Sequence, residues 1–196
     1  MPEDDLLRAV SEHTRREHAE PHMLSGHVQG RLLSMLSALM APRYILEIGT
    51  YTGYSALCLS EGLQPGGQLH TIESREAEAR VAQSFFNRSL KGNQIILHMG
   101  DAHEILAGLD YPWDLVFIDA DKPGYVAYYE QVLPRMKANG LIIADNVLFH
   151  GKVLETPPAG KNAAAIDTFN RHVSADRRTE QVMLTVRDGL MLLRKK

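Results

Sequence analysis

The stretch that decides the fold is YILEIGTYTGYS, residues 44–55. The apolar run Tyr44–Ile48 ends in a glycine and is followed by a segment with helical spacing, which predicts a strand, a tight loop and a helix. Gly49 lets the backbone pass close to a ligand, and Gly53 permits a close approach of the helix. Ligands of open α/β sheets bind at the carboxyl ends of strands, so this loop is the first candidate binding element.

Outward from this stretch, short apolar or β-branched runs predict six further strands, at 68–73, 94–99, 114–119, 141–145, 181–187 and 190–194. Helical segments lie between most of them, and this alternation indicates an α/β fold with a parallel sheet covered on both faces. Asp188-Gly189 between the last two runs predicts a tight hairpin, so we expect an antiparallel pair at the end.

Two helical stretches, about 4–20 and 25–40, precede the first strand. The second is apolar at five positions and is expected to pack on the sheet: Leu32, Leu33, Leu36, Leu39 and Met40. The first is charged, and we expect it to cover a site or a partner subunit. We therefore expect one domain over residues 1–196, with N-terminal helices in residues 1–40 covering the site.

The composition is that of a globular protein, with 196 residues, 44% hydrophobic and 23% charged. The net charge of −3 favours neither nucleic acid nor a membrane surface and excludes neither. A single cysteine, Cys58, excludes an internal disulfide and a cysteine-based metal site. No apolar run approaches membrane-spanning length, and the acidic start, Met1 to Asp5, is unlike a signal peptide. The cytoplasm is the expected location.

The loop itself favours a particular ligand. Gly49 and Gly53 lack the third glycine of a dinucleotide-binding loop, and the side chains at 50–52 leave little room for a pyrophosphate. Glu47, just before the loop, suits an ammonium group. Glu73, at the end of the second strand, can accept both hydroxyls of a ribose. A nucleoside that carries an amino acid, S-adenosylmethionine, combines these features.

Polar side chains follow two neighbouring predicted strands, as Asp119-Ala120-Asp121-Lys122 and as Asp145-Asn146. Both clusters are expected at the ligand-binding edge. Asp119, Asp145 and Asn146 offer only oxygen, which a hard cation such as Mg²⁺, or Ca²⁺ or Mn²⁺, prefers. Lys122 is placed to take the proton of a hydroxyl held beside that cation.

Four motifs together, at residues 47–55, 100–102, 119–122 and 145–148, resemble the metal-dependent, S-adenosylmethionine-dependent O-methyltransferases typified by catechol and caffeoyl-CoA O-methyltransferases. The resemblance runs from about residue 23 to the C-terminus. It implies a Rossmann-like, seven-stranded sheet, mostly parallel with an antiparallel last strand, and a homodimer. It also implies that Asp119, Asp145 and Asn146 bind the metal and that Lys122 is the catalytic base.

The same resemblance implies eight cofactor-binding residues, from the methionine end to the adenine end: Ser25, Glu47, Gly49, Thr50, Ser55, Glu73, Ala102 and Asp121. Glu73 is as in the catechol enzymes, whereas the plant coenzyme-A enzymes have aspartate. Phe149 stands where many bacterial relatives have tryptophan, and His150 stands where the plant enzymes use asparagine towards substrate. These departures leave the substrate open.

The expected function is methyl transfer to one of two adjacent hydroxyls of a catechol-like small molecule. A second hypothesis keeps the chemistry and makes a hydroxylated uridine of transfer RNA the substrate, which requires a basic surface around the cleft. Two alternatives come from other classes of protein. The first is an NAD-dependent dehydrogenase, which the missing third glycine disfavours. The second is a non-catalytic cofactor-binding module, which would not need the three candidate metal ligands together with Lys122.

Overall fold

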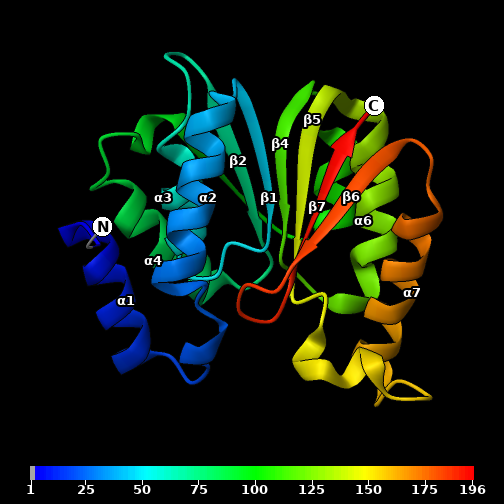
Figure 1. The fold of residues 1–196 in the computed structure, drawn as a ribbon. Coiled ribbons are helices and arrows are strands. Elements are labelled where there is room, and N and C mark those ends of the chain that lie inside the picture. The colour runs from blue at the N-terminus through cyan, green and yellow to red at the C-terminus, as the bar shows by residue number, and fades with distance from the viewer. Residues whose placement is uncertain (1–2) are drawn as a thin grey trace. The chain divides into compact units, whose positions relative to one another are not determined.

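The computed structural model describes residues 3–196, and the chain divides into two compact units, Met1–Ile105 and Leu106–Lys196 (Figure 1). Residues 1 and 2, part of the acidic start considered above, lie outside the described residues. Within 3–196, no helix is both long enough and apolar enough to cross a membrane. The helix α5 (Ala102–Gly108) runs across the boundary between the units.

The first unit contains three parallel strands, β1 (Tyr44–Ile48), β2 (Gln68–Glu73) and β3 (Ile95–Met99), with β2 in the middle. Their ends agree with the predicted strands to within one residue. The alternating helices are α3 (Tyr54–Ser60) and α4 (Glu76–Phe86), and a short 3-10 helix, η2 (Gly92–Gln94), leads into β3. Buried strand side chains form the core, as a parallel sheet covered by helices requires.

Two helices precede β1, as predicted: α1 (Asp5–Glu17) and α2 (Gly26–Met40), joined through the 3-10 helix η1 (Pro21–Met23). Asp4 caps α1, because its Oδ1 atom accepts a hydrogen bond from the Leu7 backbone N–H at 2.7 Å. Leu7 and Val10 are buried on the inner face of α1.

The packing of α2 corrects one expectation. Leu33 is buried, but Leu39 is 77% exposed and does not pack on the sheet. The contact face of α2 is instead made by small residues that bring it close to α3. A Cβ atom on Gly30 would lie 2.6 Å from the Tyr54 ring, and the Ser37 hydroxyl donates to the Leu59 carbonyl at 2.5 Å. This close approach fixes the rotation of α2 about its axis. The side of the helix that carries Leu39 therefore faces outward.

The second unit contains the other four strands: β4 (Trp113–Ile118), β5 (Met136–Asp145), β6 (Thr179–Leu184) and β7 (Leu190–Lys195). β4 and β5 are parallel, and β7 lies between β5 and β6 and is antiparallel to both. The prediction of seven strands with an antiparallel last strand is therefore confirmed.

The helices α6 (Tyr125–Val132) and α7 (Lys161–Ala175) lie side by side in this second unit (Figure 1). Three 3-10 helices complete it: η3 (Lys122–Gly124) before α6, η4 (Leu133–Arg135) after it and η5 (Phe149–Leu154) after β5.

The link between β6 and β7 is longer than predicted. β6 ends at Leu184, so Asp188 and Gly189 do not form a two-residue turn between the strands. Their carbonyls instead accept hydrogen bonds from the backbone N–H groups of Leu148 and Val147, at 2.9 and 3.1 Å. These bonds tie the link to the segment after β5, and so they favour a wider loop.

Candidate active site

The glycine loop after β1 closes as a tight turn. The Gly49 N–H donates to the Ile72 carbonyl of β2 at 3.0 Å, and the Gly53 N–H donates to the Thr50 carbonyl at 3.0 Å. Gly49 and Gly53 have φ angles of 101° and 90°, which other residues rarely adopt. A Cβ atom on Gly53 would also lie 2.7 Å from the Phe86 ring, so α3 starts close against α4.

Glu47, the carboxylate before the loop, is fully buried on β1 and held by a chain of hydroxyls. The Thr71 hydroxyl donates to Glu47 Oε2 at 2.5 Å, and the Thr50 and Thr71 hydroxyls are 2.5 Å apart. Because Thr71 gives its only proton to Glu47, Thr50 is the donor of the second bond. Thr50 therefore orients Glu47 through Thr71, a residue that the sequence analysis missed.

Glu73 ends β2 and is 5% exposed. Its Oε2 atom accepts a hydrogen bond from the Tyr51 N–H of the loop at 2.7 Å, and its Oε1 atom accepts one from the Arg75 N–H at 3.0 Å. The Arg75 guanidinium lies 5.2 Å from the centre of the Tyr51 ring and 3.4 Å from Glu73 Oε1. The Arg75 Nε–H also donates to Oε1, at 3.4 Å, so Arg75 supplies two hydrogen bonds to that oxygen. The carboxylate is thus fixed against the loop, and its Oε2 atom, with one bond from the loop, has a second lone pair that a ligand hydroxyl could use.

The remaining predicted cofactor residues of the first unit lie at the starts of helices. Ser25 precedes α2 and Ser55 is the second residue of α3, and both are 6% exposed. Ala102 begins α5, where the Asp101 carboxylate accepts hydrogen bonds from the N–H groups of the two residues that follow Ala102, at 2.9 and 3.1 Å. Asp101 therefore caps the start of α5.

The N-terminal segment contacts the loop directly. Thr14 of α1 donates to the Val10 carbonyl at 2.8 Å, so the buried contact of 2.8 Å between the Thr14 and Thr52 hydroxyls has Thr52 as its donor. The Tyr51 hydroxyl donates to the Glu20 carbonyl at 3.1 Å. These bonds place α1 and the segment after it against the glycine loop.

The polar cluster of the second unit is built around the Lys122 amine. The Nζ atom of Lys122 donates to Asp119 Oδ1 at 3.1 Å, to Asn146 Oδ1 at 2.8 Å and to the Tyr125 hydroxyl at 2.7 Å. Asp119 follows β4 and Asn146 follows β5, so the parallel neighbours bring both side chains to one place, as predicted. The three acceptors match the three protons of an ammonium group.

The end of β5 and the turn after it carry two adjacent side chains with oxygen atoms. Asp145 is 3% exposed, and its Oδ1 atom accepts a hydrogen bond from the Asn146 N–H at 2.6 Å. Asn146 has a φ of 56°, a left-handed conformation that asparagine tolerates better than most residues. Carboxylate and amide oxygens gathered around the positive Lys122 Nζ are a donor set suited to a hard cation.

Asp121 has a structural partner for each carboxylate oxygen. Its Oδ2 atom accepts from the Gly124 N–H at 3.1 Å, which caps η3, and its Oδ1 atom accepts from the Tyr128 hydroxyl at 2.5 Å. These bonds shape the segment that carries Lys122.

Tyr125 is a second residue that the sequence analysis missed. It is fully buried, and its hydroxyl lies 3.0 Å from the Asp145 carbonyl and 3.3 Å from the Ile118 carbonyl. Burial, together with the negative charges of Asp119 and Asp145, raises the pKa of Tyr125 well above its usual value. The only signal in the sequence was an aromatic residue three positions after Lys122, which reads as ordinary helix core.

The segment after Asn146 bends through two left-handed residues, Phe149 and His150, with φ angles of 45° and 56°. The Asp188 carboxylate holds this bend, because its Oδ1 atom accepts from the His150 N–H at 2.6 Å. The His150 side chain is 73% exposed. The loop that leads from here into the last helix is short, since η5 extends to Leu154 and α7 starts at Lys161.

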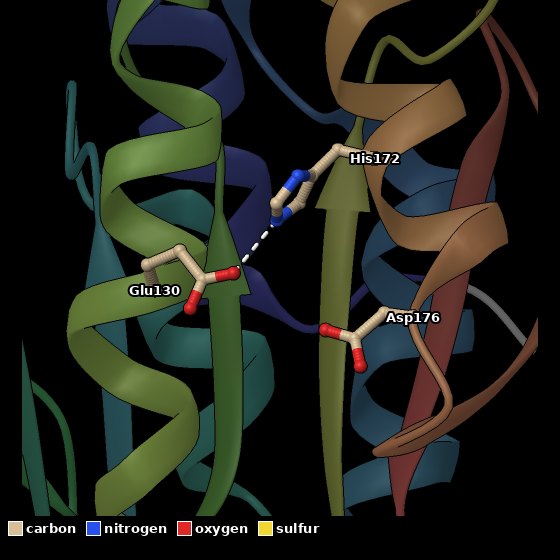
Figure 2. A group of neighbouring side chains, drawn as sticks. All are labelled: Glu130, His172 and Asp176. Atoms are coloured by element: carbon tan, nitrogen blue, oxygen red, sulfur yellow. Dashed lines mark hydrogen bonds and ion pairs between the residues drawn. The ribbon is translucent and has the colours of Figure 1, made fainter.

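A second polar cluster lies away from these residues in sequence. Figure 2 shows Glu130 from α6 facing His172 from α7, with a hydrogen bond of 2.7 Å, and Asp176 at the end of α7. Arg178 pairs with both carboxylates, at 2.7 and 2.6 Å, and lowers the pKa of each. Because the guanidinium already satisfies these oxygens, the cluster is an ion-pair network that joins α6 to α7.

Comparison with known proteins identifies the class. The profile of the O-methyltransferase family matches residues 1–196, and the chain belongs to this family of enzymes.

The chain is 35% identical to a catechol O-methyltransferase of Niastella koreensis over 93% of its own length and 84% of that protein. It is 32% identical to a caffeoyl-CoA O-methyltransferase of Populus kitakamiensis, over 98% and 87% of the two chains. A solved structure, the O-methyltransferase TomG of Streptomyces achromogenes in complex with SAM, is similar with a TM-score of 0.93 and 29% identity. That similarity covers 100% of this chain and 91% of TomG.

Proposed function

We propose that this protein is an S-adenosylmethionine-dependent and divalent-cation-dependent O-methyltransferase that acts on a small aromatic molecule with two adjacent hydroxyls. One observation carries the proposal: an amine and two oxygen ligands from two strand ends meet at one point. The Lys122 Nζ atom lies 3.1 Å from Asp119 Oδ1 and 2.8 Å from Asn146 Oδ1.

The first unit supports the choice of S-adenosylmethionine as methyl donor. Glu47 is held by the Thr71 hydroxyl, and Glu73 is held by the Tyr51 N–H of the loop. We propose that Glu47 binds the ammonium group of the donor and that Glu73 accepts its ribose hydroxyls. The same loop lacks the glycine pattern for a pyrophosphate, which disfavours a dinucleotide. TomG, similar over the whole chain, was solved with SAM.

The second unit supports the choice of a divalent cation. Asp119, Asp145 and Asn146 would hold it through oxygen. The Lys122 amine lies beside the oxygens of Asp119 and Asn146, and Asp145 directly precedes Asn146. A cation there supplies positive charge that lowers the pKa of a nearby hydroxyl and fixes two adjacent oxygens in one orientation. We propose Mg²⁺, with Ca²⁺ or Mn²⁺ as substitutes.

In the proposed mechanism Lys122 accepts the hydroxyl proton at Nζ. The resulting ammonium is then stabilised by Asp119, Asn146 and Tyr125, the three acceptors that surround it. The deprotonated oxygen attacks the methyl carbon of the donor, the carbon–sulfur bond breaks, and a methyl ether and S-adenosylhomocysteine leave. Alignment of the two reactants supplies much of the rate, because well-oriented neighbours remove roughly 7–11 kcal/mol of barrier.

The test is a methyl-transfer screen against aromatic vicinal diols, matched monohydroxy aromatics and transfer RNA that lacks the modification. Each acceptor is assayed with Mg²⁺ and with excess EDTA. We expect transfer to the diols only and only with the cation. Full turnover in EDTA would overturn the cation dependence, and transfer to the RNA alone would favour the hydroxyuridine substrate instead. Homodimer formation stays a prediction that the mass in solution tests.

A further inference from the structure

We propose that Tyr125 is a positioning residue whose buried hydroxyl holds the Lys122 amine at the ends of β4 and β5. This inference rests on the proposed function, in which Lys122 is the base, and it adds a residue that the motifs did not single out. The reasons are the hydrogen-bond geometry of the hydroxyl, its burial and its independence from the proposed metal ligands.

The Tyr125 hydroxyl has one proton to donate and carbonyl oxygens to receive it. The Asp145 carbonyl lies at 3.0 Å and the Ile118 carbonyl at 3.3 Å, so the proton points to the backbone at the strand ends. Lys122 Nζ lies 2.7 Å from the same oxygen, on which a lone pair remains. The hydroxyl therefore donates to the backbone and accepts from the amine, and it links the two strand ends to Lys122.

Burial makes this link rigid. Tyr125 is fully buried, and its ring meets the Phe169 ring edge-on, with 5.4 Å between the centres. Lys122 Nζ also lies 4.8 Å from the centre of the Tyr125 ring, close enough for a cation–π contact. The ring and the hydroxyl thus act on the same amine.

The other two acceptors of Lys122 have a second role. Asp119 and Asn146 are proposed to share their oxygens with a cation, whereas the Tyr125 hydroxyl is not a proposed ligand. Tyr125 is therefore the partner that can hold Nζ in one place whatever the other two oxygens bind. A displacement of about 1 Å at a reacting group is enough to cost about a hundredfold in rate.

The test begins with Tyr125→Phe, which removes one oxygen atom and keeps the ring. We expect kcat to fall by about tenfold to hundredfold, with the dissociation constant for S-adenosylmethionine and the KM for the acceptor changed less than about twofold. The matched control is Tyr129→Phe. Tyr129 is fully buried one turn further along α6, also meets Phe169 edge-on, and directs its hydroxyl to Asp176 at 2.8 Å. We expect Tyr129→Phe to lower the free energy of unfolding by a similar amount to Tyr125→Phe and to leave kcat unchanged.

A double-mutant cycle separates positioning from general support of the fold. In a Lys122→Ala background, Tyr125→Phe should lower the residual kcat no further than Tyr129→Phe does, because the hydroxyl has no amine left to position. If Tyr125→Phe lowers kcat by the same factor in the Lys122→Ala background as in the wild-type protein, the inference is overturned. Should Tyr125→Phe fail to fold, 3,5-difluorotyrosine at position 125 weakens the hydroxyl as an acceptor, and we expect the same selective loss of kcat.

The two proposals fail in different ways. If Lys122→Ala lowers kcat strongly while Tyr125→Phe behaves like Tyr129→Phe in every measurement, the positioning role is wrong and the proposed function stands. If Lys122→Ala keeps wild-type turnover, the assignment of Lys122 as the base is wrong, and the role of Tyr125 falls with it.

Discussion

The Nζ atom of Lys122 lies 2.8 Å from the Oδ1 atom of Asn146, although the two residues are 24 positions apart in the sequence. Lys122 follows β4 and Asn146 follows β5, which are parallel neighbours. The contact therefore depends on the strand order and not on local sequence. It places the proposed base directly beside a proposed cation ligand.

The first prediction concerns the charge of this cluster. Asp119→Asn keeps an oxygen at the same place but removes a negative charge that faces both Lys122 and the proposed cation. We expect Mn²⁺ affinity, measured by electron paramagnetic resonance, to fall on the order of tenfold to hundredfold. S-adenosylmethionine affinity, measured by calorimetry, should stay within about twofold.

Asp114→Asn is the matched control for this change. Asp114 lies on β4 in the same unit, and its carboxylate pairs with the Lys137 amine at 2.6 Å. We expect the control to leave Mn²⁺ affinity unchanged. Equal Mn²⁺ affinities for Asp119→Asn and the wild-type protein would remove Asp119 from the set of ligands.

The second prediction concerns Glu73, the proposed ligand of the ribose hydroxyls. In the wild-type protein one carboxylate oxygen of Glu73 accepts a hydrogen bond from the Tyr51 N–H, at 2.7 Å. Glu73→Gln leaves a side chain with only one acceptor oxygen, which can accept this bond in one orientation of the amide only. We expect the affinity for S-adenosylmethionine to fall by about tenfold to hundredfold, the cost of one or two hydrogen bonds to a buried charged group. At saturating donor, kcat should change much less. Glu76→Gln, an exposed partner of Arg80 on α4, should bind the donor like the wild-type protein.

Much of the fold was predictable because its signals are local. The strand over 68–73 has the predicted ends, since Pro65-Gly66-Gly67 marks the turn before it and alternation of strand and helix defines the rest. The beginning of β5 was not predictable in this way. Asn139, with a φ of 64°, and Gly140 have the composition of a turn, but the strand continues through them. Met136 pairs with Trp113 of β4, the register then shifts, and regular pairing resumes at Leu141.

The residues of the candidate site also differ in whether they have a local signal in the sequence. Residues that lie in motifs were found from the sequence, because their residue types and spacing carry the chemistry. Thr71 and Tyr125 were missed, because a threonine in a strand and a tyrosine in a helix have no local signal of a role. Thr71 acts through the register that pairs it with Glu47, and Tyr125 acts through the strand ends that its hydroxyl joins. Such roles arise only from tertiary contacts.

The last prediction concerns the dependence of stability on pH, and it comes from two stacked histidines. His70 on β2 is 1% exposed, and its Nδ1 atom lies 2.9 Å from Nε2 of His98 on β3. Burial, with a smaller effect from the charge of His98, lowers the pKa of His70 to about 4. Burial also lowers the pKa of His98.

A histidine of the unfolded chain has a pKa of about 6.5. Between about pH 6.5 and pH 4, the unfolded chain therefore binds more protons at His70 than the folded protein does. The free energy of unfolding should fall as the pH is lowered through this window, by about 3 kcal/mol from His70, and this contribution should level off below about pH 4.

Urea unfolding at half-unit pH steps from 7.5 to 4 measures this dependence, and His70→Leu removes the titrating group while keeping an apolar side chain in the buried position. We expect the variant to show a flatter profile over the window, whatever its absolute stability, because only the slope reports the bound proton. His22→Gln, at an exposed histidine in η1, should keep the wild-type slope. If His70→Leu and the wild-type protein lose stability in parallel from pH 6.5 to 4, the acid sensitivity comes from groups other than His70.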